Sequence, residues 1–237
     1  MRACATSCSA RRSRRSSAIL TRIDHVAIGA ADLGAGIAAY RRIGFDVDER
    51  GVAVNDGDRL ELVRGVDGLQ SIAIASDDLA ADSARGGADY IELVEQKNAA
   101  KASRHPNGVL RIERVYIAVK DVAAAAKEYS RVLGVPAPKM ELGTVIHADM
   151  AIFQFGPSAL GLAQPAGPGV AAHALLSRGP GPFQILYRTS SMNAAAKWMA
   201  EHGVPPPARG IRNTGEQAML VPPAHACGVY IGFVGPA

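Results

Sequence analysis

Two stretches of the chain carry nearly the same pattern of apolar and polar positions. Residues 22–40 read RIDHVAIGAADLGAGIAAY, and residues 111–129 read RIERVYIAVKDVAAAAKEY, which aligns with the first without a gap. Each begins with a short β-rich run and continues, after an aspartate, with a helix-like stretch. The repeat predicts a duplicated strand–helix unit, in which His25 of the first copy is replaced by Arg114 in the second.

Both helix-like stretches have recognisable ends. Asp32 and Asp121 can accept hydrogen bonds from the first free backbone N–H groups, and Gly44 and Gly134 follow as C-terminal stops. The two helices are expected at about residues 33–43 and 122–133.

Strand-like runs follow each helix, separated by Gly, Asp and Pro turn residues. The first set is FDVDE, GVAVND and RLELVRG, and the second is PKMEL, DMAIFQFG and ALGLAQP. Each unit is therefore predicted to run strand–helix–strand–strand–strand. Two weaker copies begin at GLQSIAIASDDL and GPFQILYRTSSM, and the first of these is compressed, with HPNGVLRIE as its final strand. The four units are expected at about residues 22–66, 68–110, 111–166 and 180–235.

These units predict an α+β fold. Because each strand set has one apolar face, the units must pair to bury it. We expect four βαβββ modules, the second shortened, that pair into cup-shaped mixed sheets. Modules one and two would form a domain at residues 22–110, and modules three and four a domain at residues 111–237. Residues 1–21 are expected to be a disordered leader rich in Arg and Ser.

The positive net charge comes from the leader rather than from the predicted domains. Residues 1–22 contain six arginines and no acidic residue, against a net charge of +4 for the whole chain. A nucleic-acid partner is not expected, because a basic footprint should lie on the folded domain. The leader is either a disordered segment or misplaced start, or an organellar transit peptide.

Membrane insertion and disulfide bonding are not expected. No apolar stretch approaches the roughly 18 residues that a membrane-spanning helix needs. The three cysteines, Cys4, Cys8 and Cys227, are too scattered for a disulfide framework or a zinc site. A cytoplasmic location is therefore expected.

Three motifs, the first of which lies within the repeat, carry a resemblance to a known family. The opening DHVAIGAADL, the stretch RGPGPFQILY before the last helix and the ending HACGVYIGFV resemble the vicinal oxygen chelate superfamily. That superfamily includes glyoxalase I, methylmalonyl-CoA epimerase, extradiol dioxygenases and bleomycin-resistance proteins. The resemblance covers about residues 22–235. It implies the glyoxalase/bleomycin-resistance/dioxygenase fold, with a divalent metal held inside a cup by residues of the first and last strands of each unit.

The matching positions hold few metal-ligating residue types. They are His25 and Glu61 in unit one, Ser71 and either Ile112 or Glu113 in unit two, Arg114 and Gly161 in unit three, and Gln184 and Gly232 in unit four. Arginine is permanently protonated and cannot bind a cation. Two ligand sets stay open: His25 and Glu61 with Ser71 or Glu113 if units one and two share a cup, or His25, Glu61 and Gln184 if unit one faces unit four.

Two classes of function follow from the resemblance. With Zn, Ni, Co, Mn or Fe bound, the protein would be a lyase, isomerase or epimerase of a small oxygenated metabolite, and Glu61 would carry the proton. Without metal, it would be a non-catalytic protein that sequesters a small ligand, and Arg114 would pair with an anionic group of that ligand. An extradiol dioxygenase has weaker support, because it needs two histidines and a carboxylate on Fe(II). A homodimer is left open.

Overall fold

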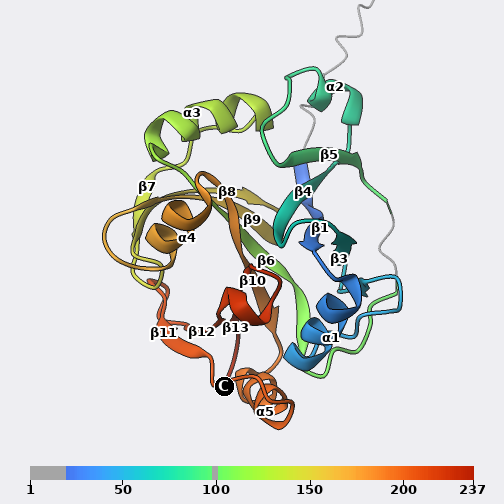
Figure 1. The fold of residues 1–237 in the computed structure, drawn as a ribbon. Helices are drawn as coiled ribbons and strands as arrows, with labels where there is room; N and C mark the ends of the chain where they lie inside the picture. Colours follow the sequence, from blue (N-terminus) through green and yellow to red (C-terminus); the bar gives the residue numbers. More distant parts are fainter. Residues whose placement is uncertain (1–19, 98–100) are drawn as a thin grey trace, which may run out of the picture.

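The computed structural model describes residues 20–97 and 101–237, which form two β-sheets with helices around them (Figure 1). Sheet A has five strands in the order β2-β3-β1-β4-β5, and sheet B has eight in the order β11-β12-β13-β10-β6-β9-β8-β7. The strands of sheet A are β1 (Leu20–Ala30), β2 (Val52–Val54), β3 (Arg59–Arg64), β4 (Gly68–Ser76) and β5 (Ile91–Glu95). Those of sheet B are β6 (Val109–Ala118), β7 (Met140–Gly143), β8 (Ala148–Phe155), β9 (Ser158–Pro165), β10 (Gly181–Thr189), β11 (Ala208–Ile211), β12 (Gln217–Val221) and β13 (Tyr230–Val234).

The helices follow the predicted modules. They are α1 (Leu33–Ile43), α2 (Leu79–Ser83), α3 (Val122–Leu133), α4 (Val170–Arg178) and α5 (Met192–Glu201), with a 3₁₀ turn at Pro223–His225. Sheet B contains two complete βαβββ modules, one around α3 and one around α5. The α+β fold with paired modules is therefore confirmed.

The modules of sheet A are shorter than predicted. The run FDVDE forms no strand, so module one has two strands after its helix and module two has one, instead of three. The final strand of module two is β5, which pairs in parallel with β4. The residues of HPNGVLRIE from Val109 onward belong instead to β6, which pairs with β9 and β10. The sequence pattern located β4 and β6 but missed β5, and it could not say which sheet would take each strand.

The predicted ends of the first helices are present. The side chain of Asp32 accepts a hydrogen bond from Ala35 N, and that of Asp121 from Ala124 N. Gly44 and Gly134 follow the two helices in the left-handed conformation, with φ of 98° and 67°. Glycine suits these positions because a Cβ is disfavoured there.

One hydrophobic core joins the two sheets. Ile23 and Val26 of β1 and Ile112 and Val115 of β6 belong to the same buried cluster. β4 and β10 lie in contact, and Ile23 N donates a hydrogen bond of 2.8 Å to Ser158 Oγ across the two sheets. The two halves of the chain are therefore packed as one body.

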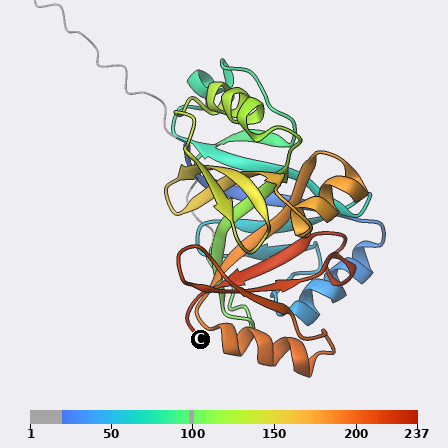
Figure 2. The same cartoon turned by 90° about the vertical axis from the view of Figure 1, so that its left-hand side faces the viewer.

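Helices from different modules pack side by side. Trp198 Nε1 of α5 donates to Arg41 O of α1 at 3.3 Å. At the other end, Arg85 donates to the carbonyl oxygens of Val132 and Leu133 at the end of α3. Figure 2 shows α5 and α3 at opposite ends of the molecule, with the sheets between them. At the helices, module one thus contacts module four, and module two contacts module three.

The expected leader falls almost entirely outside the described residues. Leu20 and Thr21, assigned to it from the sequence, already belong to β1. Among the helices of residues 20–97 and 101–237, none is long and apolar enough to cross a membrane.

Candidate functional site

Strand register in sheet B places the four expected ligand positions of modules three and four on one face. Arg114 pairs with Leu186, and Tyr116 pairs with Gln184, across the antiparallel strands β6 and β10. Gly161 lies opposite Tyr116, and Gly232 lies opposite Leu186, in the flanking parallel strands. Since directly opposed residues point to the same side, these positions line one surface, which we call the cup of sheet B.

A cavity of about 420 Å³ lies over this cup. Its wall is mostly apolar, with Tyr116, Ile146, Leu186, Ile211 and Leu220 among the lining residues, and it also includes Arg209 and Arg212. A volume of this size is ordinary for a site that holds a small organic molecule.

Gln184 is a buried polar residue of the cavity floor. Its side chain is only 3% exposed, and its Oε1 has no hydrogen-bond partner among the described residues. A buried amide oxygen that lacks a hydrogen bond is unfavourable, so this atom is suited to accept from a bound molecule.

Arg114 lies beside Tyr116 on the same strand. Its Nη1 donates to Tyr116 Oη at 3.1 Å, and its guanidinium carbon is 5.6 Å from the centre of the Tyr116 ring. Its Nε is buried without a partner, and none of the carboxylates in the described part of the chain pairs with it. Arg114 therefore keeps an uncompensated positive charge in the cup.

Two other partly buried arginines near the cup are neutralised. Arg188 and Arg212 form a four-membered network with Glu113 and Glu216. Arg212 Nη1 lies 2.7 Å from Glu113 and 2.9 Å from Glu216. The hydrogen bond from Arg188 lowers the pKa of Glu216, and its ion pairs raise the pKa of Arg188 despite the opposing effect of burial. The two arginines and two glutamates balance one another.

The glycines at the remaining cup positions leave no room for a ligand side chain. A Cβ at Gly161 would lie 2.6 Å from Cδ1 of Tyr116, and a Cβ at Gly232 would lie 2.7 Å from Cδ1 of Leu186. Tyr116 and Leu186 thus fill the space where metal ligands would project. With Arg114 on the same face, the donor set of this cup does not fit a divalent metal.

In sheet A, His25 and Glu61 lie on one face, as the metal hypothesis requires. His25 pairs with Arg59, and Ala27 pairs with Glu61, in the parallel strands β1 and β3. Asp24 accepts a hydrogen bond of 2.8 Å at its Oδ2 from His25 Nδ1, because an ionised carboxylate can only accept. The hydrogen bond from His25, together with the Arg59 charge, holds the pKa of Asp24 below its ordinary value.

Arg59 takes the place beside these residues that a cation would need. Its Nη1 lies 2.7 Å from Asp24, and its Nε lies 2.5 Å from Glu61. Burial works to lower the pKa of Arg59, but the ion pairs with Glu61 and Asp24 raise it above the ordinary value. Glu61 is thus bound to an arginine rather than free to hold a metal or carry a proton.

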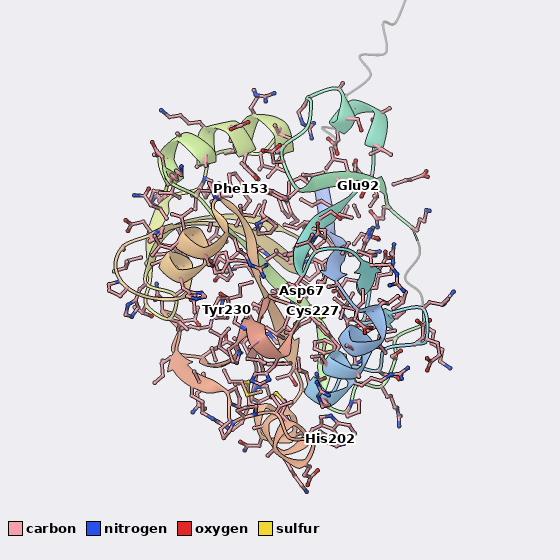
Figure 3. All side chains as sticks on the ribbon, in the orientation of Figure 1. Asp67, Glu92, Phe153, His202, Cys227 and Tyr230 are labelled. Carbon is pink, nitrogen blue, oxygen red and sulfur yellow. The ribbon has the colours of Figure 1, made fainter. Side chains whose placement is uncertain are left out.

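The fourth expected ligand position of sheet A is held by a different residue from the one predicted. In β5, Glu92 lies opposite Ala73, which itself pairs with His25, so Glu92 stands where Ile112 or Glu113 was expected (Figure 3). Ile112 and Glu113 belong to sheet B. No local signal marks β5 as the last strand of its module, because the compressed repeat offers HPNGVLRIE as the stronger strand pattern.

The structure does not bring His25, Glu61 and Gln184 together. His25 and Glu61 belong to sheet A, whereas Gln184 belongs to sheet B, because module one pairs with module two and module four with module three. Ser71 does share the face of His25. Even so, no three His, Cys, Asp or Glu side chains within residues 20–97 and 101–237 converge as a metal site would require.

Comparisons with known proteins agree with this architecture. Residues 113–220 match the family model of the Glyoxalase/Bleomycin resistance protein/Dioxygenase superfamily. This stretch, which lies in sheet B, is similar to the vicinal oxygen chelate superfamily. A methylmalonyl-CoA epimerase from Mycobacterium tuberculosis is similar at 26% identity, with a TM-score of 0.50 over 55% of this chain and 90% of that one. None of the curated proteins compared with the chain matched it.

The whole two-sheet arrangement also has a counterpart. A mutant 4-hydroxymandelate synthase from Streptomyces coelicolor superposes with a TM-score of 0.70 over 92% of this chain and 93% of that one, at 11% identity. At this identity the likeness concerns the vicinal oxygen chelate fold alone.

Two residues of the cup were not anticipated from the sequence. Tyr116 lies two residues after Arg114 on β6, so strand alternation places it on the same face. Arg212 lies in the loop after β11, and its place beside Glu113 depends on contacts between distant segments. Alternation could have found the first, but no local signal points to the second.

Proposed function

We propose that this protein of the vicinal oxygen chelate fold binds a small oxygenated metabolite in the cup of sheet B, without a metal ion. The observation that supports this proposal concerns Gln184, which lies on the floor of a cavity of about 420 Å³. Its buried Oε1 lacks a hydrogen-bond partner among the described residues. A hydroxyl or N–H group of a ligand that donates to this oxygen would remove a penalty of about 1–3 kcal/mol.

The proposal favours binding over metal-dependent catalysis. Glu61, expected to carry a proton, is ion-paired with Arg59 in sheet A. In the cup of sheet B, Arg114 stands at a ligand position, and Gly161 and Gly232 offer no donor atoms. These residues therefore give no support to a lyase, isomerase or epimerase step through a metal. Sequestration of a ligand, as in bleomycin-resistance proteins, is the function that they support best.

Binding of a neutral probe tests the proposal. N-phenyl-1-naphthylamine is apolar and carries one N–H donor, and its fluorescence rises in an apolar site. The full chain is expected to bind one equivalent, with the same affinity before and after treatment with a chelator. Ala208→Trp should abolish binding, because Ala208 lines the cavity from an exposed position and an indole there would fill it.

Ala123→Trp is the matched control, since Ala123 is exposed on α3 and does not line the cavity. It should bind the probe as the wild type does. Loss of binding on chelation, or equal binding by the two tryptophan variants, would refute the proposal.

A further inference from the structure

A second, smaller cavity adjoins the first one in the cup of sheet B. Its volume is about 90 Å³, and it is lined by Arg114 and Arg212, by the hydroxyl-bearing Thr144 and Thr214, and by Asn213. Tyr116 lines both cavities, so its side chain lies at their junction. The site thus consists of a large, mostly apolar chamber and a small chamber that Arg114 lines, and the two share one wall.

The guanidinium of Arg114 presents one unused edge. Nη1 is engaged by the Tyr116 hydroxyl, whereas Nε and Nη2 have no partner among the described residues. Nε and Nη2 together form a planar pair of donors that matches the two oxygens of a carboxylate. The Tyr116 hydroxyl accepts from Arg114 and keeps its own hydrogen for a second contact.

The charges around the small chamber favour an anion with a single charge. Arg212 is already neutralised by Glu113 and Glu216, so Arg114 supplies the one uncompensated positive charge. Glu141 also lines the chamber, but its carboxylate is exposed, so solvent screens its charge and the half-buried Arg114 dominates the field there. A doubly charged phosphate would meet too little positive charge here, whereas a carboxylate is matched.

We propose that the ligand is a carboxylic acid with an apolar body: the carboxylate binds Arg114 in the small chamber, and the body fills the large chamber beside Gln184. This inference rests on the proposed function, because it assigns a ligand class to the same cup. The class follows from the unused edge of Arg114, the single net charge and the apolar wall of the larger cavity.

Three matched probes test the class by calorimetric titration of the full chain. 3-Phenylpropionate has the carboxylate and the apolar body, 3-phenylpropan-1-ol lacks the carboxylate, and phenyl phosphate replaces it with a dianion. The acid is expected to bind at least about tenfold more tightly than either of the others. In Arg114→Met the acid should lose this advantage over the alcohol.

Arg111→Met is the control, because it removes the same charge from the same strand. Arg111 donates to Pro157 O at 2.7 Å and lines neither chamber. This variant should keep the preference for the acid. Equal binding of acid and alcohol by the wild type, tighter binding of the phosphate, or an equal loss in both variants would overturn the inference.

The two proposals fail in different ways. If N-phenyl-1-naphthylamine binds in the cup but the acid does not, the ligand class is wrong and the cup remains a binding site. If neither the neutral probe nor the acid binds, both proposals are refuted.

Discussion

Two buried tyrosines differ in whether the hydroxyl has a hydrogen-bond partner, and this difference should affect the stability of the fold. Tyr40 and Tyr187 are both fully buried, and their rings pack against Phe45 with centroid distances of 5.7 Å and 4.9 Å. The Tyr40 hydroxyl donates to Ala226 O at 3.3 Å, whereas the Tyr187 hydroxyl has no hydrogen-bond partner among the described protein groups. Burial, with the nearby Asp58 charge, raises the pKa of Tyr187 far above its ordinary value.

Replacing each tyrosine by phenylalanine should therefore have opposite effects. Tyr187→Phe is expected to increase the free energy of unfolding by about 1 kcal/mol, because it removes a buried polar group that makes no hydrogen bond. Tyr40→Phe is expected to decrease it by about 1 kcal/mol, because it removes the hydrogen bond to Ala226 O and leaves that oxygen with Val229 N as its one remaining donor. Urea unfolding of both variants measures the difference. If Tyr187→Phe destabilises as much as Tyr40→Phe, the Tyr187 hydroxyl has a partner in solution.

At the scale of elements, the helix ends are where local sequence and tertiary packing meet. Gly44 ends α1, and Gly203 follows α5, both with positive φ, of 98° and 71°. A Cβ at Gly44 would lie 2.8 Å from Asn107 Cβ and 2.8 Å from Trp198 Cδ1, whereas nothing lies within 4 Å of one at Gly203. Both glycines end a helix, but at Gly44 the neighbouring residues also leave no space for a side chain.

Alanine at these two positions separates the backbone effect from the packing effect. Gly203→Ala should lower the free energy of unfolding by about 1 kcal/mol, the cost of placing a Cβ in the left-handed region. Gly44→Ala should lower it by at least about 2 kcal/mol, because the backbone strain is joined by the overlap with Asn107 and Trp198. Thermal and urea unfolding would measure both. Equal losses would mean that α1 and α5 move apart without cost.

At the scale of the whole molecule, Asp58 links the two sheets. Its Oδ2 accepts from Ile112 N in β6 at 2.8 Å, and its Oδ1 accepts from Asn55 Nδ2 at 2.5 Å. Burial raises the pKa of Asp58 to about 7, and the hydrogen bonds from Asn55 and Ile112 only partly oppose this. A carboxyl with a raised pKa binds its proton more tightly in the folded state than in the unfolded state.

Stability should therefore fall as pH rises between about 4 and 7. In this range the folded chain keeps the Asp58 proton that the unfolded chain has lost, so each increase in pH favours unfolding. The effect is on the order of 3 kcal/mol, and Asp58→Asn should remove it while its amide keeps the contact with Ile112. Urea unfolding of both proteins between pH 4 and 8 measures it.

His105 changes the stability with pH in the opposite direction to Asp58. Burial lowers the pKa of His105, so its contribution is lost as pH falls. That contribution is common to wild type and Asp58→Asn and cancels in their difference. Parallel pH curves for the two proteins would show that Asp58 titrates normally.

The local elements of this protein follow from the order of its residues alone. Asp32 and Asp121 as helix caps, Gly44 and Gly134 as stops, and the repeated strand–helix pattern depend on residues close together in the chain, so they could be predicted. Arg114 could also be identified as a departure from a metal site, because an arginine cannot ligate a cation in any fold.

Which modules share a sheet depended instead on packing between distant segments. That pairing separated Gln184 from His25 and Glu61, and it placed Glu92 on the face of His25. Strand pairing joins segments far apart in the chain, and the alternation of a strand gives its two faces but not its neighbour. The cup around Arg114 and Gln184 therefore became visible only once register and packing were known.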